Sequence, residues 1–208
     1  MRRAEEQRAD VVRHGLRLGV LTVGWNALEA LISIVAGTVA GSIALIGFGL
    51  DSVIETSSGA VMFWRLATDR DGTRRDARER RALRLIGFCF LALAAYVGYE
   101  ATASLIAREA PDASPIGIAL ATLSLIVMPL LARAKRKVAG EIGSHAMRAD
   151  ARQTDICAYL SAILLGGLVL NALFGWWWAD AVAALLMTPI IVKEGVQALR
   201  GKSCAGCC

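Results

Sequence analysis

Two carboxylates four residues apart stand inside an apolar stretch of this sequence. Asp51 and Glu55 share one face of an α-helix, because a spacing of four residues is close to one helical turn. When nothing lies between them, their negative charges repel each other, and a divalent cation or a proton would relieve that repulsion. The pair indicates a site that can hold a cation and release it on protonation.

A second polar group has helical spacing further along the chain. Asp150, Gln153 and Cys157 follow an i, i+3, i+7 pattern and lie on one helix face. Asp155 lies well around the same helix. For Gln153 and Cys157, an interhelical hydrogen bond and a small packing residue explain the pattern as well as ligation does.

The composition predicts which elements position these residues. Of the 208 residues 56% are hydrophobic, 20 others are glycine, and the mean hydropathy is +0.52. A soluble domain has about 45–50% apolar residues with glycine included, so this chain is too apolar for one. Aromatic residues make up only 6%, which favours packed helices over a β-barrel. We expect an all-α membrane protein, not a disordered chain, a coiled coil or a disulfide scaffold.

Stretches of about 20 mostly apolar residues, enough to cross a bilayer as a helix, occur six times. They form one predicted transmembrane domain, residues 18–199, between a basic N-terminal segment, residues 1–17, and a Cys-rich tail, residues 200–208. The six predicted spans are Leu18–Ala40, Ile43–Trp64, Leu85–Ala107, Ile116–Ala132, Ile156–Phe174 with a polar lead-in from Arg148, and Trp176–Val192 with an amphipathic exit to Leu199.

The basic residues predict the orientation of the spans. Almost all of the 23 Lys and Arg residues fall in the N-terminal segment, after the second and fourth spans, or at the C-terminal end. Basic segments stay in the cytoplasm, so both termini are predicted to be cytoplasmic in a multi-pass protein of the cytoplasmic membrane. This topology explains the net charge of +5 without a nucleic-acid partner. Glu55 and Cys157 are then expected at similar depth near the midplane.

Ionisable residues inside or beside the spans are the most informative feature. A charged side chain at the centre of a membrane helix costs at least about 2.5–3.5 kcal/mol, so such residues mark ion or proton paths. All but one of these residues are acidic, as a cation site requires, because the ion supplies the missing positive charge. They are Glu29, Asp51, Glu55, Glu100, Asp150, Arg152, Asp155 and Asp180.

Structural roles are the alternative for several of these acids. Glu29, Glu100 and Asp180 lie near span ends or within reach of polar neighbours, and for them a structural role is favoured. For Asp51 and Glu55 the alternative is a packing acid satisfied by nearby hydroxyls. Candidate partners are Trp25, Asn26 and Tyr99 for the first group, and Ser52, Thr56 and Ser57 for the second.

Three segments of the sequence resemble the cation diffusion facilitators. They are SIALIGFGLDSVIE at 42–55, RADARQTDIC at 148–157 and WADAVAALL at 178–186, which resemble spans two, five and six of that family. The resemblance covers nearly the whole chain. It implies a cation-efflux-like bundle of six spans, a homodimer, and export of divalent metals such as zinc, iron, manganese or cobalt in exchange for protons.

The resemblance also implies a set of ligands. The four family positions fall on Asp51, Glu55, Gln153 and Cys157, and Asp150 can compensate from one turn away. The family usually has His and Asp where this chain has Gln153 and Cys157. A thiolate favours zinc or another soft metal, so zinc is the expected substrate, with no permanently bound cofactor.

The C-terminal end departs from the family pattern. The chain ends soon after the sixth span, so the resemblance predicts a short form without the C-terminal cytoplasmic domain of most members. Cys204, Cys207 and Cys208 are candidates for capturing zinc or copper(I) in the reducing cytoplasm, and a redox-sensitive or incidental tail is the alternative.

Two other functions compete with export. The main alternative is a non-transporting membrane protein that binds metal as a sensor or as an accessory subunit of another exporter. The departures at Gln153 and Cys157 favour it somewhat. An enzyme with a thiol redox centre is the least favoured reading, because the sequence has no Ser/His/Asp or phosphate-binding motif. We therefore expect a transporter and not an enzyme.

Overall fold

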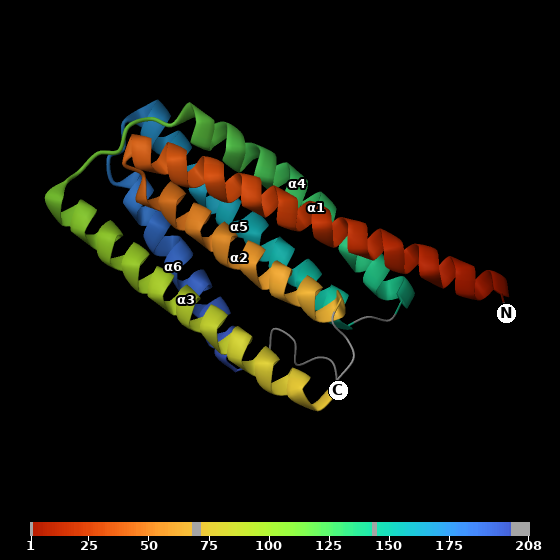
Figure 1. Cartoon of the computed structure of the whole chain (residues 1–208). Helices are drawn as coiled ribbons and strands as arrows, with labels where there is room; N and C mark the ends of the chain where they lie inside the picture. The colour runs from red at the N-terminus through yellow and green to blue at the C-terminus, as the bar shows by residue number, and fades with distance from the viewer. Residues whose placement is uncertain (1, 68–71, 143–144, 201–208) are drawn as a thin grey trace.

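The computed structural model describes residues 2–67, 72–142 and 145–200, with side chains for residues 13–57, 84–141, 148 and 150–200. Over this part of the chain the secondary structure consists of six helices and no strands, which confirms the all-α prediction. They are α1 (Arg2–Ala40), α2 (Ile43–Ala67), α3 (Gly72–Ala107), α4 (Pro115–Ile142), α5 (His145–Phe174) and α6 (Ala179–Leu199). Successive helices run in opposite directions in one bundle (Figure 1).

Five of these helices are long and apolar enough to cross a membrane, which makes this a multi-pass membrane protein. Large apolar side chains such as Val39 and Ile106 are about 80% exposed on the bundle surface, as lipid-facing residues would be. α2 is not among the five, and its side chains are described only as far as Ser57. The five segments are Arg13–Ala40, Arg84–Ala107, Pro115–Glu141, Asp150–Phe174 and Ala179–Leu199.

The helices are arranged so that α2 and α5 meet inside the bundle. α3 packs on α6 along one edge, and α1 packs on α4 along the other, with α2 and α5 between them (Figure 1). Glycines bring α1 and α2 close together. A Cβ added at Gly37 would lie 2.9 Å from Cγ1 of Ile46, and one at Gly49 would lie 2.9 Å from Cβ of Ser33. Such small residues allow membrane helices to pack tightly.

Several helix ends differ from the predicted spans. α4 continues to Ile142, so the basic run after Ala132 is helical and not a loop, which is reasonable because Lys and Arg are good helix formers. α6 begins at Ala179, three residues later than predicted from Trp176. The reason lies at Gly175, which ends α5 with a left-handed φ of 64° and redirects the chain before α6 starts.

The basic side chains of the described residues gather at one end of the bundle. This is the end where α2, α4 and α6 finish and α3 and α5 begin (Figure 1). Among the described Lys and Arg side chains, Arg108 lies at the opposite end. The others are Arg13, Arg17, Arg84, Arg133, Lys135, Arg136, Lys137, Arg148, Arg152, Lys193 and Arg200.

Candidate metal centre

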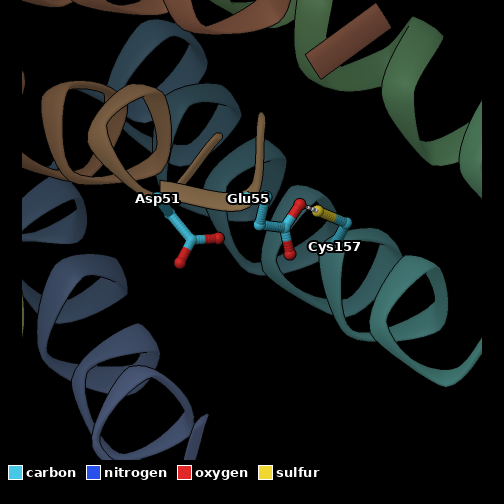
Figure 2. A group of neighbouring side chains, drawn as sticks. All are labelled: Asp51, Glu55 and Cys157. Atoms are coloured by element: carbon cyan, nitrogen blue, oxygen red, sulfur yellow. Dashed lines mark hydrogen bonds between the residues drawn. The ribbon is translucent and has the colours of Figure 1, made fainter. Parts of the chain in front are cut away.

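Asp51 and Glu55 of α2 meet Cys157 of α5 at the interface between the two helices. All three side chains are buried, and one potential ligand atom from each lies within 4.8 Å of the other two. Figure 2 shows both carboxylates extending from the same side of α2, with Glu55 directed at Cys157. The two polar stripes expected from the sequence therefore face each other.

The Glu55 carboxylate receives hydrogen bonds from two other helices. From α5, the Cys157 thiol donates to Oε2 at 2.6 Å, and Nε2 of Gln153 donates to Oε1 at 2.8 Å. From α1, Nδ2 of Asn26 donates to Oε2 at 2.9 Å. Oδ1 of Asn26 is itself buried without a partner. Donors on two neighbouring helices thus hold Glu55 in one orientation.

The Asp51 carboxylate differs, because no group in the described part of the chain donates a hydrogen bond to it. The ionisable side chains that act on it electrostatically are Glu55, Glu194, Glu29 and the Cys157 thiol, and none of them is a base. Burying a carboxylate without donors or a counter-charge is unfavourable. The arrangement at Asp51 is therefore suited to an external cation.

Asp150 does not join this group. Its Oδ2 lies 2.8 Å from Nζ of Lys135, an ammonium group on α4 whose side chain is fully buried. Nζ of Lys135 also donates to Thr154 at 3.0 Å. Asp150 therefore neutralises a buried lysine. It does not compensate for the departures at Gln153 and Cys157, a role that its position one turn away had suggested.

Asp180 has a structural position, in agreement with the role favoured from the sequence. The Ser42 hydroxyl donates to Oδ1 at 2.5 Å. The backbone N–H groups of Ile43 and Ala44 donate to Oδ2 at 2.9 and 3.2 Å. Because the first N–H groups of a helix have no partner within it, Asp180 of α6 caps α2 from a neighbouring helix.

The hydroxyls considered as alternative partners for Asp51 and Glu55 bond elsewhere. Ser52 donates to Oε2 of Glu29 at 3.0 Å, and Ser57 donates to the carbonyl of Val53. Oγ1 of Thr56 is buried without a partner. These three hydroxyls therefore do not explain why Asp51 and Glu55 are buried.

Two residues of this region, Asn26 and Glu194, were not predicted as part of it. Asn26 was considered only as a partner for other acids, although a lone amide inside an apolar span is a signal for an interhelical hydrogen bond. Glu194 lies in the polar end of the last span, where an acidic residue is common and does not by itself indicate a site. Its proximity to Asp51 depends on how α6 packs against α2.

The three cysteines of the predicted metal-capture tail, Cys204, Cys207 and Cys208, lie outside the described residues. Their role stays a prediction.

Comparison with known families agrees with this architecture. The family model for the cation efflux transmembrane domain matches residues 82–202, which is more than half of the chain. The protein therefore belongs to the cation efflux family. The match includes Gln153 and Cys157 on α5, whereas Asp51 and Glu55 on α2 lie before it.

Several curated proteins are similar over most of the chain. An uncharacterized transporter of Methanocaldococcus jannaschii is 29% identical over 181 residues, covering 84% of this chain and 63% of that protein. An uncharacterized transporter of Synechocystis is 26% identical over 187 residues, covering 87% of this chain and 60% of that protein. Transmembrane protein 163 of Xenopus laevis is 26% identical over 189 residues, covering 88% and 67%. The chain thus spans less than two thirds of the length of the two transporters.

Proposed function

We propose that this protein exports a divalent metal cation, with zinc as the favoured substrate, in exchange for protons. The observation on which the proposal rests is the buried group of Asp51, Glu55 and Cys157 at the interface of α2 and α5, in a member of the cation efflux family. Acidic ligands inside a membrane protein, with no base among their hydrogen-bond partners, favour a cation as their missing counter-charge.

The proposed topology has six spans, with α2 as the sixth membrane helix beside the five identified by length and composition. The end that gathers the basic side chains is the cytoplasmic end, because Lys and Arg are retained on that side of a membrane. Both chain ends then lie in the cytoplasm, and the membrane is the cytoplasmic membrane. Metal enters the site from the basic end of the bundle.

The donor set suits zinc. Two carboxylate oxygens and one thiolate are three of the four ligands that a tetrahedral zinc site takes, and Zn²⁺ accepts both kinds of atom. An amide oxygen of Asn26 or Gln153, or a water molecule, supplies the fourth. The thiol must lose its proton to bind metal, so binding releases a proton, and protons compete with the metal for these groups.

The proposed cycle alternates access to this site. Metal binds between α2 and α5 from the cytoplasm, a rocking movement of the helices opens the site to the other side, and protons displace the metal there. A homodimer is the proposed assembly.

Flux measurements test the proposal. The purified protein is reconstituted into vesicles that contain a zinc indicator, and Zn²⁺ uptake is followed with an imposed pH gradient. We expect uptake by the natural protein and none by the double variant Asp51→Asn and Glu55→Gln, because the variant lacks both charges. Glu100→Gln is the matched control, since it makes the same chemical change on α3, and it should transport normally.

The outcomes distinguish export from its main rival. If the natural protein binds Zn²⁺ but shows no uptake, it is a sensor or an accessory subunit. If the double variant transports as well as the natural protein, the assignment of the site is wrong. Deleting residues 204–208 in the same assay tests whether the cysteine tail delivers metal to the site.

A further inference from the structure

Glu29 is a fully buried carboxylate on α1 that the proposed metal site does not use. Its Oε2 accepts a hydrogen bond from Ser52 of α2 at 3.0 Å, and its Oε1 has no partner. α1 packs against α2 and α4, so Glu29 lies between three helices. Nothing in the export scheme explains why an acidic side chain with 0% exposure stands there.

The ionisable groups around Glu29 are acidic. Asp51 and Glu55 from α2, and Cys157 from α5, lie within electrostatic reach of it. No Lys, Arg or His side chain among the described residues forms an ion pair with Glu29. The buried lysine of α4, Lys135, is bound to Asp150 and Thr154 instead.

This charge pattern gives Glu29 two alternative states. With the metal site empty, three buried carboxyl groups share one region without a base, and a neutral Glu29 reduces their mutual repulsion. A divalent cation at Asp51 and Glu55 adds two positive charges nearby, which makes an ionised Glu29 tolerable. Metal and proton therefore oppose each other, although they occupy different groups.

The polar neighbours of Glu29 fit both states. Ser33 lies one helical turn further along α1, and Ser124 of α4 lies beside the carboxylate; both hydroxyls are fully buried without a partner. Their oxygens can accept a hydrogen bond from a protonated Oε1. The Trp25 indole N–H is also buried, unpartnered and close to Glu29, and as a pure donor it stabilises the ionised form more than the protonated one.

We propose that Glu29, with Ser33, Ser52 and Ser124 around it, is a proton-binding site separate from the metal ligands and that its proton is exchanged for the metal. When metal binds, the O–H bond at Oε1 breaks and the proton passes to water; when metal leaves, Oε1 takes a proton again. Because coupling between two ligands is reciprocal, proton binding at Glu29 weakens metal binding by the same factor. This inference rests on the proposed metal export and names the group that couples it to protons.

Zinc accumulation in vesicles measures the coupling. With the membrane potential clamped at zero, each coupled proton changes the steady-state Zn²⁺ ratio about tenfold per pH unit of gradient, since about 1.4 kcal/mol corresponds to a factor of ten. The slope of the logarithm of this ratio against the pH difference counts protons. In Glu29→Gln we expect transport with the slope reduced by one, whereas Glu100→Gln keeps the natural slope. An unchanged slope in Glu29→Gln overturns the inference.

Infrared spectroscopy tests the same site without transport. In the purified full chain, a protonated Glu29 gives a carboxylic-acid C=O band that disappears when Zn²⁺ is added and that Glu29→Gln lacks. If Glu29→Gln does not fold, the Ser52→Ala variant is used to assign the band. Loss of the hydrogen bond to Oε2 must shift the C=O band if it belongs to Glu29. A spectrum without a band that responds to Zn²⁺ overturns the inference. If the natural protein shows the band but no Zn²⁺ uptake, export fails while the proton site stands.

Discussion

Asp180 and Asp51 are both almost fully buried acids of the helix bundle, yet their surroundings are opposite. Asp180 accepts hydrogen bonds from one hydroxyl and two backbone N–H groups at the start of α2. Asp51, two helical turns further along α2, receives none from the described residues and lies among other acids. The first carboxylate is satisfied by the protein, and the second has neither a donor nor a base among the described residues.

If the proposed metal site is correct, the surroundings of an acid separate structural acids from functional ones better than burial does. Asp150 and Asp155 of α5 are also satisfied, by Lys135 and Arg136 of α4. Burial alone would place Asp51 and Asp180 in the same class. What distinguishes them is whether donors or a base surround the carboxylate, since an unpaired charge inside a protein is costly to retain.

The largest expected effect follows from removing the cap on α2. Asp180→Ala leaves one hydroxyl and two backbone N–H groups without an acceptor, and each buried donor so left costs about 1–3 kcal/mol. We expect the free energy of unfolding in mixed detergent micelles to fall by roughly 3–5 kcal/mol. Zn²⁺ affinity of the folded fraction should not change. Weakened metal binding at full stability would show that Asp180 belongs to the functional class.

Asp150→Ala should have the next largest effect, again on stability. It leaves the fully buried ammonium of Lys135 without its counter-charge, and leaving a buried charge unpaired costs about 3 kcal/mol. The double change with Lys135→Met should restore stability. Asp155→Ala is the control, because its partner Arg136 is partly exposed and such a pair contributes only about 0–1 kcal/mol. A large loss of Zn²⁺ affinity in Asp150→Ala would show that Asp150 contributes to the metal centre.

Asp51→Asn should lower Zn²⁺ affinity and leave stability unchanged, the opposite of the two preceding variants. The amide cannot supply a negative charge to the cation, so Zn²⁺ affinity, measured by equilibrium dialysis, should fall about a hundredfold, or about 2.7 kcal/mol. The free energy of unfolding without metal should not decrease, because a neutral amide at this buried position needs no counter-charge. A destabilised variant with normal Zn²⁺ affinity would place Asp51 with Asp180 among the structural acids.

The smallest effect is expected at Asn26. Asn26→Ala removes the hydrogen bond to Oε2 of Glu55 that helps to orient this carboxylate. Groups that position a metal ligand are worth about 10–100-fold in affinity, and we expect about tenfold here because Gln153 and Cys157 still hold Glu55. Asn26→Asp restores a polar side chain without the donor. Because Asp also adds a negative charge, it is expected to bind Zn²⁺ more tightly than Asn26→Ala; an unchanged affinity in Asn26→Ala would show that the hydrogen bond to Glu55 does not support metal binding.

Much of the architecture was predictable because it depends on local signals. The apolar stretches indicate helices, and the spacing of Asp51 with Glu55, and of Gln153 with Cys157, fixes which side chains share a face. Facing stripes on α2 and α5 follow once the two helices are neighbours. The resemblance to the family supplied that pairing, which residue spacing by itself does not contain.

The unexpected features depend on contacts between distant segments. Lys135 stands in a run of basic residues that the sequence presents as a cytoplasmic loop, and only the continuation of α4 beside α5 buries it against Asp150. Asn26 reaches Glu55 because glycines let α1 approach α2 closely. No periodicity along one helix reports which residue of another helix lies opposite.

The ligands of bound zinc test the central claim most directly. X-ray absorption at the zinc edge is measured on the full chain with Cys204→Ser, Cys207→Ser and Cys208→Ser, so that the tail contributes no sulfur. We expect one sulfur at about 2.3 Å, with oxygens at about 2.0–2.2 Å, and loss of the sulfur in the additional variant Cys157→Ser. Zinc bound without sulfur, or a sulfur signal that persists in Cys157→Ser, would contradict a metal site between α2 and α5.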